Sequence, residues 1–320
     1  MVMQKNKKYD IVGIGNAIVD LIAEVDDSYL EKNSINKGSM SLVDYDVANR
    51  IGDEVDIVKT ISGGSVANSI VCIAQQNLKT VFIGKVNQDE LGEKFAKGLA
   101  EENVEFKITK SLANKHTARC IILVSPDAER TMNTYLGVSQ ELTEEDVDLN
   151  IIEESSILYL EGYLWDLDNA KKAIKKSIST AINSETKIAF SISDAFCVDR
   201  FREEFIDLVN NSADIIFANE SEIKSLFEKN ELNDAIKKCQ DTKKIFAVTL
   251  GDKGAKIIYK NEVVNIKAEI IDKLVDTTGA GDLFAAGFLA EYIRSQDLES
   301  SGKEGVKMAS IIIQQFGARV

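Results

Sequence analysis

Short apolar runs alternate along the chain with longer segments in which apolar residues recur at a helical period. The runs are rich in β-branched residues and end at Gly, Asn or Ser, which is typical of strands buried on both faces. Their alternation with helical segments predicts an α/β fold, in which a mostly parallel sheet has helices on both faces. The predicted strands are 9–15, 80–86, 187–193, 214–219 and 244–250, and the predicted helices are 66–76, 89–102, 168–183, 199–211, 220–229, 282–294 and 303–316.

Two regions, 22–60 and 104–138, break this alternation because they contain strand-like pieces with little convincing helix between them. The segment 125–130 holds the only proline and predicts a hairpin connection. We expect the two regions to pair into a small sheet at one edge of the main domain. The residues alone fit a lid over a cleft and an ordinary extension of the sheet equally well. The chain 1–320 is expected to form one domain.

Composition narrows the classes of function. The net charge of −14 argues against a nucleic-acid-binding protein, although a local site can still attract anions. The N-terminus does not resemble a signal peptide, and no apolar run approaches the roughly 18 residues of a membrane-spanning helix. The cysteines are isolated, which predicts reduced thiols and a cytoplasmic protein. The only histidine, His116, makes a Ser-His-Asp triad or a multi-histidine metal site improbable.

Two glycine-containing stretches in the first quarter of the chain carry candidate ligand-binding side chains. In "GIGNAIVD" (13–20), Ile18 stands where a dinucleotide fingerprint needs a small residue, and the chain has no P-loop. Asp20 follows a strand and a turn, where doubly wound folds bind ligands, but a solvated loop acid fits equally. In "SGGSVAN" (62–68), Asn68 falls in the first turn of a helix and could contact a polar ligand. A glycine turn with a serine cap at Ser65 explains the same pattern.

Two further motifs follow predicted strands. In "FANESEI" (217–223), Asn219 and Glu222 fit a helix capping box, and the same pair could hold a hydrated Mg²⁺. The stretch "AVTLGDKGAKII" (247–258) predicts a strand, a glycine-rich turn and a second strand. Taken alone it is a hairpin, and beside a nucleotide its backbone would contact a base or ribose.

The segment "DTTGAGDLFAAGFLAEY" (276–292) has the most specific pattern in the chain. Its helix is apolar almost all round, which predicts a central, buried helix whose N-terminus opens onto a protected place. Gly279 and Gly281 leave backbone N–H groups accessible, and together with the helix dipole these form an anion site. A carboxylate beside an anion, Asp282, is unfavourable unless it takes a proton from an attacking hydroxyl. Phosphoryl transfer therefore explains the segment better than a simple N-cap does.

The chain resembles the PfkB (ribokinase-like) carbohydrate kinase family essentially from end to end. The similarity rests on "DTTGAGD" and "GGSVAN", and extends to "GNAIVD", "FIGKVNQDELGEKF" (82–95), "NESE" and "TLGDKG". Within the family, "GNAIVDLIAEV", "GGSVANSI" and the stretch 191–223 are most similar to the adenosine kinase branch. The resemblance implies a three-layer sandwich with a mostly parallel central sheet and a small β-sheet lid built from about 22–60 and 104–138.

The resemblance also assigns roles at the reacting centre. It implies that Asp282 is the catalytic base and that the N–H groups of Gly279, Ala280 and Gly281 form the anion hole for the γ-phosphate. The positions that it implies for binding the acceptor hydroxyls are Asn16, Asp20, Gly63, Gly64 and Asn68. A wall for a purine base cannot be aligned, and its candidates, each equally a core residue, are Met40, Tyr135, Tyr163 and Phe196.

The remaining implied roles concern the nucleotide and its ions. Asn219 and Glu222 match a pair that organises Mg²⁺ and phosphates through water. Arg130, in the lid hairpin, matches an arginine that reaches the phosphates. The turn on the ATP side contains Thr249, Gly251 and Gly254, and a monovalent cation such as K⁺ is implied at Asp276 and Thr278.

These implications together predict an ATP- and Mg²⁺-dependent kinase. The expected reaction moves the γ-phosphate to a primary hydroxyl of a nucleoside, with adenosine converted to AMP. The alternative acceptor is a sugar, such as fructose or another ketose or sugar acid. A third hypothesis is a non-catalytic sensor on the same fold. The expected partners are these small molecules and neither a nucleic acid nor a membrane. The chain is expected to be a monomer or a homodimer joined through the lid.

Overall fold

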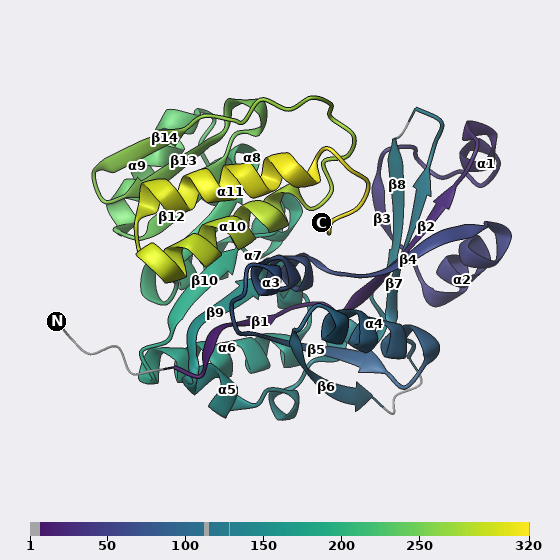
Figure 1. Ribbon diagram of the computed structural model, residues 1–320, viewed down its shortest axis with the longest axis horizontal. Helices are drawn as coiled ribbons and strands as arrows, with labels where there is room; N and C mark the ends of the chain where they lie inside the picture. The colour runs from purple at the N-terminus through teal and green to yellow at the C-terminus, as the bar shows by residue number, and fades with distance from the viewer. Residues whose placement is uncertain (1–6, 112–114, 128, 320) are drawn as a thin grey trace.

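The computed structural model describes residues 7–111, 115–127 and 129–319. A nine-stranded sheet runs through the larger part of the molecule (Figure 1), in the order β14-β13-β12-β11-β10-β9-β1-β5-β6. Neighbouring strands pair in parallel except at one edge, where β12–β13 and β13–β14 are antiparallel. The strands are β1 (Tyr9–Ile14), β5 (Thr80–Asn87), β6 (Glu105–Ser111), β9 (Ser155–Glu161), β10 (Lys187–Ser191), β11 (Ile215–Asn219), β12 (Ile245–Thr249), β13 (Ala255–Tyr259) and β14 (Glu262–Ile266).

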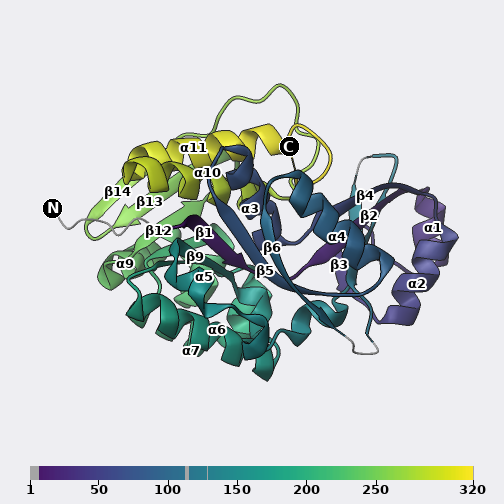
Figure 2. The same cartoon turned by 60° about the horizontal axis from the view of Figure 1, so that its bottom comes forward.

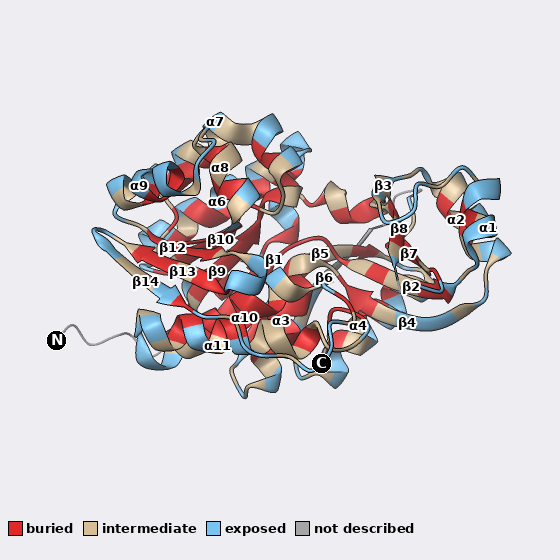
Figure 3. Ribbon diagram, turned by 90° about the horizontal axis from the view of Figure 1, so that it is seen from above, coloured by how far each residue is buried: buried red, intermediate tan, exposed pale blue. Residues whose placement is uncertain are grey.

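Helices cover both faces of this sheet and bury it, as the continuous apolar runs predict (Figure 3). One face packs against α5 (Leu149–Glu153), α6 (Asp168–Asn183), α7 (Ala195–Asn211), α8 (Glu220–Leu226) and α9 (Leu232–Thr242). The other packs against α3 (Ser65–Gln75), α4 (Glu90–Glu101), α10 (Ala280–Ser295) and α11 (Leu298–Ile312). Four short 3₁₀ helices occur in connections: η1 (Gly137–Glu141), η2 (Glu144–Asp146), η3 (Gly162–Trp165) and η4 (Gly251–Lys253).

A second sheet, of five strands, stands beside the larger one (Figures 1 and 2), in the order β3-β8-β7-β2-β4. Two helices, α1 (Asp27–Lys32) and α2 (Tyr45–Glu54), pack on one of its faces through a small apolar core around Leu30, Ile51 and Ile121. The strands are β2 (Ile18–Glu24), β3 (Met40–Leu42), β4 (Ile57–Gly63), β7 (Ala118–Val124) and β8 (Arg130–Tyr135).

The predicted α/β class is confirmed, and the five predicted strands and seven predicted helices all occur. The second sheet differs from the prediction in three ways: where it starts, the helices that pack on it, and which strands belong to it. The sheet begins at Ile18, and α1 and α2 lie in the region where little helix was expected. Asp44 caps α2 by accepting from the Val47 N–H at 2.8 Å, a local signal that the strand-like interpretation overlooked. The segment Glu105–Ser111 is β6, which pairs with β5 in the larger sheet, so the predicted range 104–138 starts too early.

Elements outside the prediction also shape the site. The strand β9, which was not among the predicted ones, lies inside the larger sheet, between β10 and β1. The helix α11 begins at Leu298 rather than at 303, because Asp297 accepts from the Ser300 N–H at 2.7 Å and caps it there. All four cysteines are buried and free of disulfides. Among the described residues, no helix is long and apolar enough to span a bilayer.

Candidate active site

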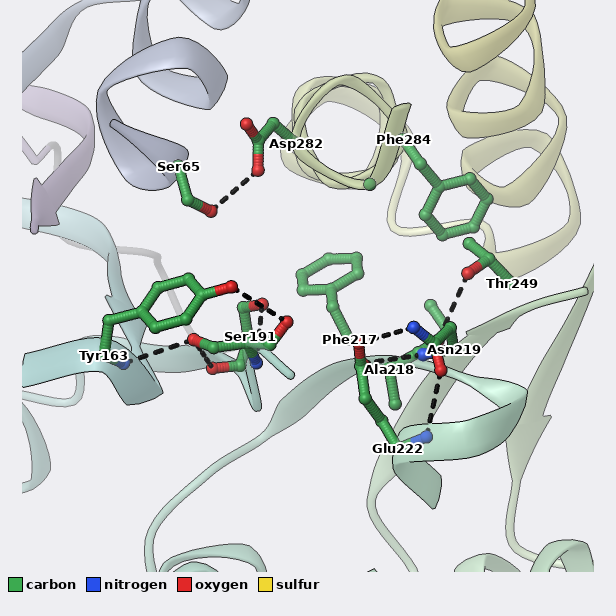
Figure 4. A pocket seen from close by; sticks show the side chains of 13 residues that line it. Ser65, Tyr163, Ser191, Phe217, Ala218, Asn219, Glu222, Thr249, Asp282 and Phe284 are labelled. Carbon is green, nitrogen blue, oxygen red and sulfur yellow. Dashed lines mark hydrogen bonds between the residues drawn. The ribbon is translucent and has the colours of Figure 1, made fainter. Parts of the chain in front are cut away.

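Polar side chains stand at the carboxyl ends of four adjacent parallel strands. Glu161 ends β9, Ser191 ends β10, Asn219 ends β11 and Thr249 ends β12. In an open α/β sheet, ligands bind in the crevice beyond such ends. A hollow of about 240 Å³ lies there, and the first turn of α10 reaches its rim (Figure 4). Its lining includes the strand-end residues Ser191, Asn219 and Thr249, with Gly281 and Asp282.

The N-terminus of α10, where the anion site is predicted, has two glycines in different surroundings. Gly279 is the N-cap and has the left-handed φ of 78°, and a Cβ there would lie 2.7 Å from the Cβ of Ala318. A Cβ on Gly281, by contrast, would meet no atom within 4 Å, so the space above it is open. One part of the prediction needs correction: the Ala280 N–H already donates to the Thr277 carbonyl at 3.1 Å. The open space lies at Gly281, where the helix dipole favours negative charge.

Asp282 lies in the first turn of α10 and faces α3. Ser65 Oγ donates to its Oδ1 at 2.7 Å, and Asn68 Nδ2 donates to its Oδ2 at 3.0 Å (Figure 4 shows the first contact). Burial raises the pKa of Asp282, and the hydrogen bonds from Asn68 and Ser65 oppose that rise. The N-cap of α3 is Gly64, so the serine-cap alternative is wrong, and the Ser65 hydroxyl serves Asp282 instead. A held carboxylate of raised pKa suits the acceptance of a proton.

Asn219 and Glu222 form a complete capping box at the start of α8. The Asn219 side chain accepts from the Glu222 N–H at 2.9 Å, and Glu222 accepts from the Asn219 N–H at 2.8 Å. Burial raises the pKa of Glu222 to about 7. The described residues contain no group of three His, Cys, Asp or Glu side chains that could hold a metal. A divalent ion at this pair would therefore take most ligands from water and phosphate, as Mg²⁺ commonly does.

A second hollow, of about 300 Å³, adjoins the first, because Ser65 and Tyr163 line both. One part of its lining is apolar and comes from the second sheet and α7. The residues of that part are Ile18, Met40, Leu42, Leu136 and Phe196. Met40, Leu42 and Phe196 are 49%, 60% and 76% exposed, which is unusual for large apolar side chains.

Asn16 and Glu161 are two of the polar residues that line the second hollow. Glu161 is fully buried and accepts from the Asn16 N–H and Nδ2, both at 2.8 Å, and from the Val66 N–H at 3.2 Å. No cation pairs with it among the described residues, and burial raises its pKa to about 7 despite these hydrogen bonds. Asn16 is 3% exposed, and its Oδ1 has no partner within the described chain. That oxygen can accept a hydrogen bond from a ligand.

Asp20 lies in β2, on the second sheet, rather than in a loop. Its carboxylate packs against Gly63 and occupies the space that a side chain there would need, because a Cβ on Gly63 would lie 2.5 Å from Asp20 Oδ2. Gly64 has a φ of 100°, and a Cβ there would lie 2.2 Å from the Asn16 carbonyl oxygen. The two glycines therefore allow β2, β4 and α3 to meet at this corner. Burial raises the pKa of Asp20 to about 6, against the charges of Arg319 and Arg130.

Arg130 and Asp276, for which different roles were predicted, form a buried ion pair with each other. Asp276 also accepts from the Thr278 N–H at 2.9 Å and the Gly317 N–H at 3.0 Å. Burial acts to raise the pKa of Asp276, but these donors and Arg130 hold it below its usual value. The carboxylate expected to bind a monovalent cation is thus already neutralised by the arginine expected to reach phosphate. Both predicted roles stay predictions, and in this structure the two residues are partners of each other.

The other predicted residues take different places. Gly251 and Gly254 form the turn between β12 and β13, with φ of 61° and 88°, and neither lines the described hollows. Tyr135 lies in the second sheet rather than in the hollow, where its ring is edge-on to the ring of Tyr45 with 5.5 Å between the ring centroids. The residues near the site that were not predicted for it include Leu42 and Glu161, which line the second hollow, and Arg319, which contacts Asn68. Glu161 had a usable signal, as a lone acid at the end of the apolar run 157–160.

Comparison with known proteins agrees with this geometry. Residues 10–320 match the family described as pfkB family carbohydrate kinase. An adenosine kinase structure from Sinorhizobium meliloti is 40% identical, with a TM-score of 0.90 over 98% of this chain and 96% of that one. A probable sugar kinase from Rhizobium etli is 38% identical, with a TM-score of 0.91 over 98% and 95%. Adenosine kinase from Saccharomyces cerevisiae is 26% identical over 96% of this chain and 95% of its own. The chain therefore belongs to the pfkB family of carbohydrate kinases and is a phosphotransferase whose acceptor is a hydroxyl group.

Proposed function

We propose that this protein transfers the γ-phosphate of ATP to the 5′-hydroxyl of adenosine, giving AMP and ADP. The observation that carries the proposal is the second hollow, which has an apolar wall of Met40, Leu42 and Phe196 and a polar end at Asn16 and Glu161. An apolar wall suits the faces of a purine, and polar groups suit the ribose and the base edge. The 40% identity to an adenosine kinase supports the same acceptor.

The residues at the junction of the two hollows fit phosphoryl transfer. Family membership implies ATP and a divalent metal. The open space at Gly281 fits the transferred phosphate, and the Asn219–Glu222 pair fits a hydrated Mg²⁺. Asp282 stands beside this space and takes the proton from the acceptor hydroxyl, while the N-terminus of α10 stabilises the charge on the phosphate oxygens. The five-stranded sheet, which carries Asp20 and much of the apolar wall, is proposed to act as the lid over the acceptor.

A sugar is the second candidate acceptor. Asp166, Asp194 and Arg200 also line the second hollow, and charged groups there suit sugar hydroxyls better than a purine. Arg200 and Asp166 already pair with each other at 3.1 Å. The 38% identity to a probable sugar kinase supports this candidate.

A coupled assay of ADP release with adenosine, other nucleosides and common sugars, with and without K⁺, tests the proposal. We expect adenosine to give the highest kcat/KM. The Asp282→Asn variant should bind adenosine but lose turnover by about 10²- to 10⁴-fold, the usual contribution of a general base. A ketose with the highest kcat/KM would replace adenosine as the acceptor. Near wild-type turnover by Asp282→Asn would overturn the mechanism for either acceptor.

A further inference from the structure

Arg319 follows α11 and lies against the site that the other residues form. Its Nε donates to Asn68 Oδ1 at 3.2 Å. Burial lowers its pKa to about 10, so the guanidinium is still charged at neutral pH. Two hydrogen bonds hold the backbone around Arg319 in place. The Gly317 N–H donates to Asp276 at 3.0 Å, and Gln315 Nε2 donates to the Arg319 carbonyl at 3.0 Å. The arginine is therefore a built part of this corner of the molecule.

The chemistry of the three side chains gives their contacts one direction. An arginine has only donors, and an ionised carboxylate has only acceptors. Asn68 stands between Arg319 and Asp282, with Oδ1 toward the arginine and Nδ2 toward the carboxylate at 3.0 Å. If the Asn68 amide were turned over, its NH₂ group would face the donor of Arg319 and its oxygen would face the acceptor of Asp282, so neither hydrogen bond could form. Arg319 thus fixes the orientation of the Asn68 amide, and the amide fixes one oxygen of Asp282.

We propose that Arg319 is a positioning residue, which acts through Asn68 to hold the Asp282 carboxylate in place for the phosphoryl transfer. The inference rests on the proposed function, because Asp282 has no reaction to serve without it. The second donor to Asp282, Ser65 Oγ, holds the other oxygen and does not depend on Arg319. Loss of Arg319 therefore loosens one side of the carboxylate and leaves the other side held.

A double-mutant cycle tests whether the arginine acts through the amide. Arg319→Met removes every donor and keeps the bulk of the stem, and we expect kcat to fall about ten-fold, the usual size of one hydrogen bond to a charged group. Arg319→Lys keeps a charged donor and should recover most of the loss. In an Asn68→Ala background, Arg319→Met should cause almost no further loss, because its route to Asp282 is already broken.

Arg294 provides a matched control at the opposite end of the same two helices. It lies in α10 and its Nη2 donates to the Gln76 carbonyl, at the end of α3, at 2.6 Å. Arg294→Met removes the same charge and a hydrogen bond to α3 that lies away from Asp282. Because Arg294 is exposed, the melting temperature should change little, and kcat should stay unchanged.

A second readout does not depend on which acceptor the enzyme uses. The Asp282 carboxyl is titrated by ¹³C NMR without substrate, in the wild type and in Arg319→Met. Its other titratable neighbours are Asp20 from β2, Tyr159 and Glu161 from β9, and Tyr163 from η3. Asp20 also loses the charge of Arg319 in the variant, so its titration is followed in the same spectra and separated from that of Asp282. The variant should titrate at higher pH, because a donor to the ionised form is no longer fixed.

Three results would overturn the proposal. Equal losses from Arg319→Met with and without Asn68 would show that the arginine acts by another route. A raised KM for the acceptor at unchanged kcat would make Arg319 a direct ligand. An unchanged Asp282 titration in a destabilised variant would leave only a structural role. If no acceptor is phosphorylated, the proposed function fails, and the titration still decides whether Arg319 positions Asp282.

Discussion

The two sides of the active site are assembled in different ways. On the side that we assign to the phosphate, the phosphate side, each group of residues is a short local motif: a helix start at 279–282, a capping box at 219–222 and a strand end at Thr249. On the acceptor side, neighbours in space are far apart in sequence, because Asn16, Gly64 and Glu161 come from the segment before β2, the start of α3 and the end of β9. The phosphate side rests on the larger sheet, whereas much of the acceptor side is carried by the second sheet. Substitutions on the phosphate side should therefore lower turnover, whereas substitutions on the acceptor side should weaken binding of the acceptor.

The sharpest test on the phosphate side is Gly281→Ala. The methyl group enters the open space that we assign to the phosphate, and it meets no protein atom within 4 Å. We expect kcat to fall about 10²- to 10³-fold, comparable to the loss of an oxyanion-hole donor. Alanine should also stabilise the helix by about 0.5–1 kcal/mol, so the variant loses activity without losing stability.

Gly52→Ala is the control for that variant. Gly52 is in α2, and a Cβ there would come no closer than 3.9 Å to Ile121 Cδ1. The substitution should raise the melting temperature by about as much as Gly281→Ala does and leave kcat unchanged. A Gly281→Ala enzyme with wild-type kcat would mean that the phosphate does not occupy the space at the start of α10.

Local motifs of the site could be predicted from the sequence, whereas contacts between residues far apart in the chain could not. The anion site and the capping box were predicted because backbone geometry over four residues determines them. The pairing of Arg130 with Asp276 could not be predicted, because 146 residues separate them and only the folded chain brings them together. Glu161 was missed together with the strand that it ends, because the run 157–160 was not interpreted as β9.

The fold shows the same limit. Long segments with a clear period were placed within a few residues, whereas the six-residue α1 and the ten-residue α2 were missed within a β-rich region. Their stability comes from packing against the second sheet rather than from their own propensity. The separation of β6 from that sheet likewise depends on long-range pairing with β5, which the residues of β6 do not specify.

Glu161 lines the second hollow, and its burial predicts how stability depends on pH. Burial raises its pKa from the usual 4.5 of a glutamate to about 7, so the folded protein binds this proton more tightly than the unfolded chain does. Its contribution to stability is complete below about pH 4.5 and is lost as the pH rises toward 7. The shift corresponds to about 3 kcal/mol of unfolding free energy.

Glu161→Gln removes this titration. Relative to the variant, the wild type should lose about 3 kcal/mol of unfolding free energy between pH 4.5 and pH 8, measured by urea denaturation. Glu153→Gln, at an exposed glutamate in α5, is the control and should leave the pH dependence of the wild type unchanged. If the wild type and Glu161→Gln show parallel pH profiles, Glu161 is not the group that couples folding to pH.

The smallest effect is expected from Asp20→Asn on the acceptor side, which keeps the shape of the side chain and removes its charge. Asp20 has a pKa of about 6, so it is ionised at pH 7.5 and accepts charge-assisted hydrogen bonds from acceptor hydroxyls. We expect the KM for the acceptor to rise about ten-fold at pH 7.5, with kcat little changed. The wild-type KM should itself rise as the pH falls below about 6, because Asp20 takes up a proton, and the variant should lack that rise. Glu24→Gln, at an exposed position of the same strand, should leave both quantities unchanged. A variant that lowers kcat at constant KM would place Asp20 with the phosphate side and break the division between the two halves of the site.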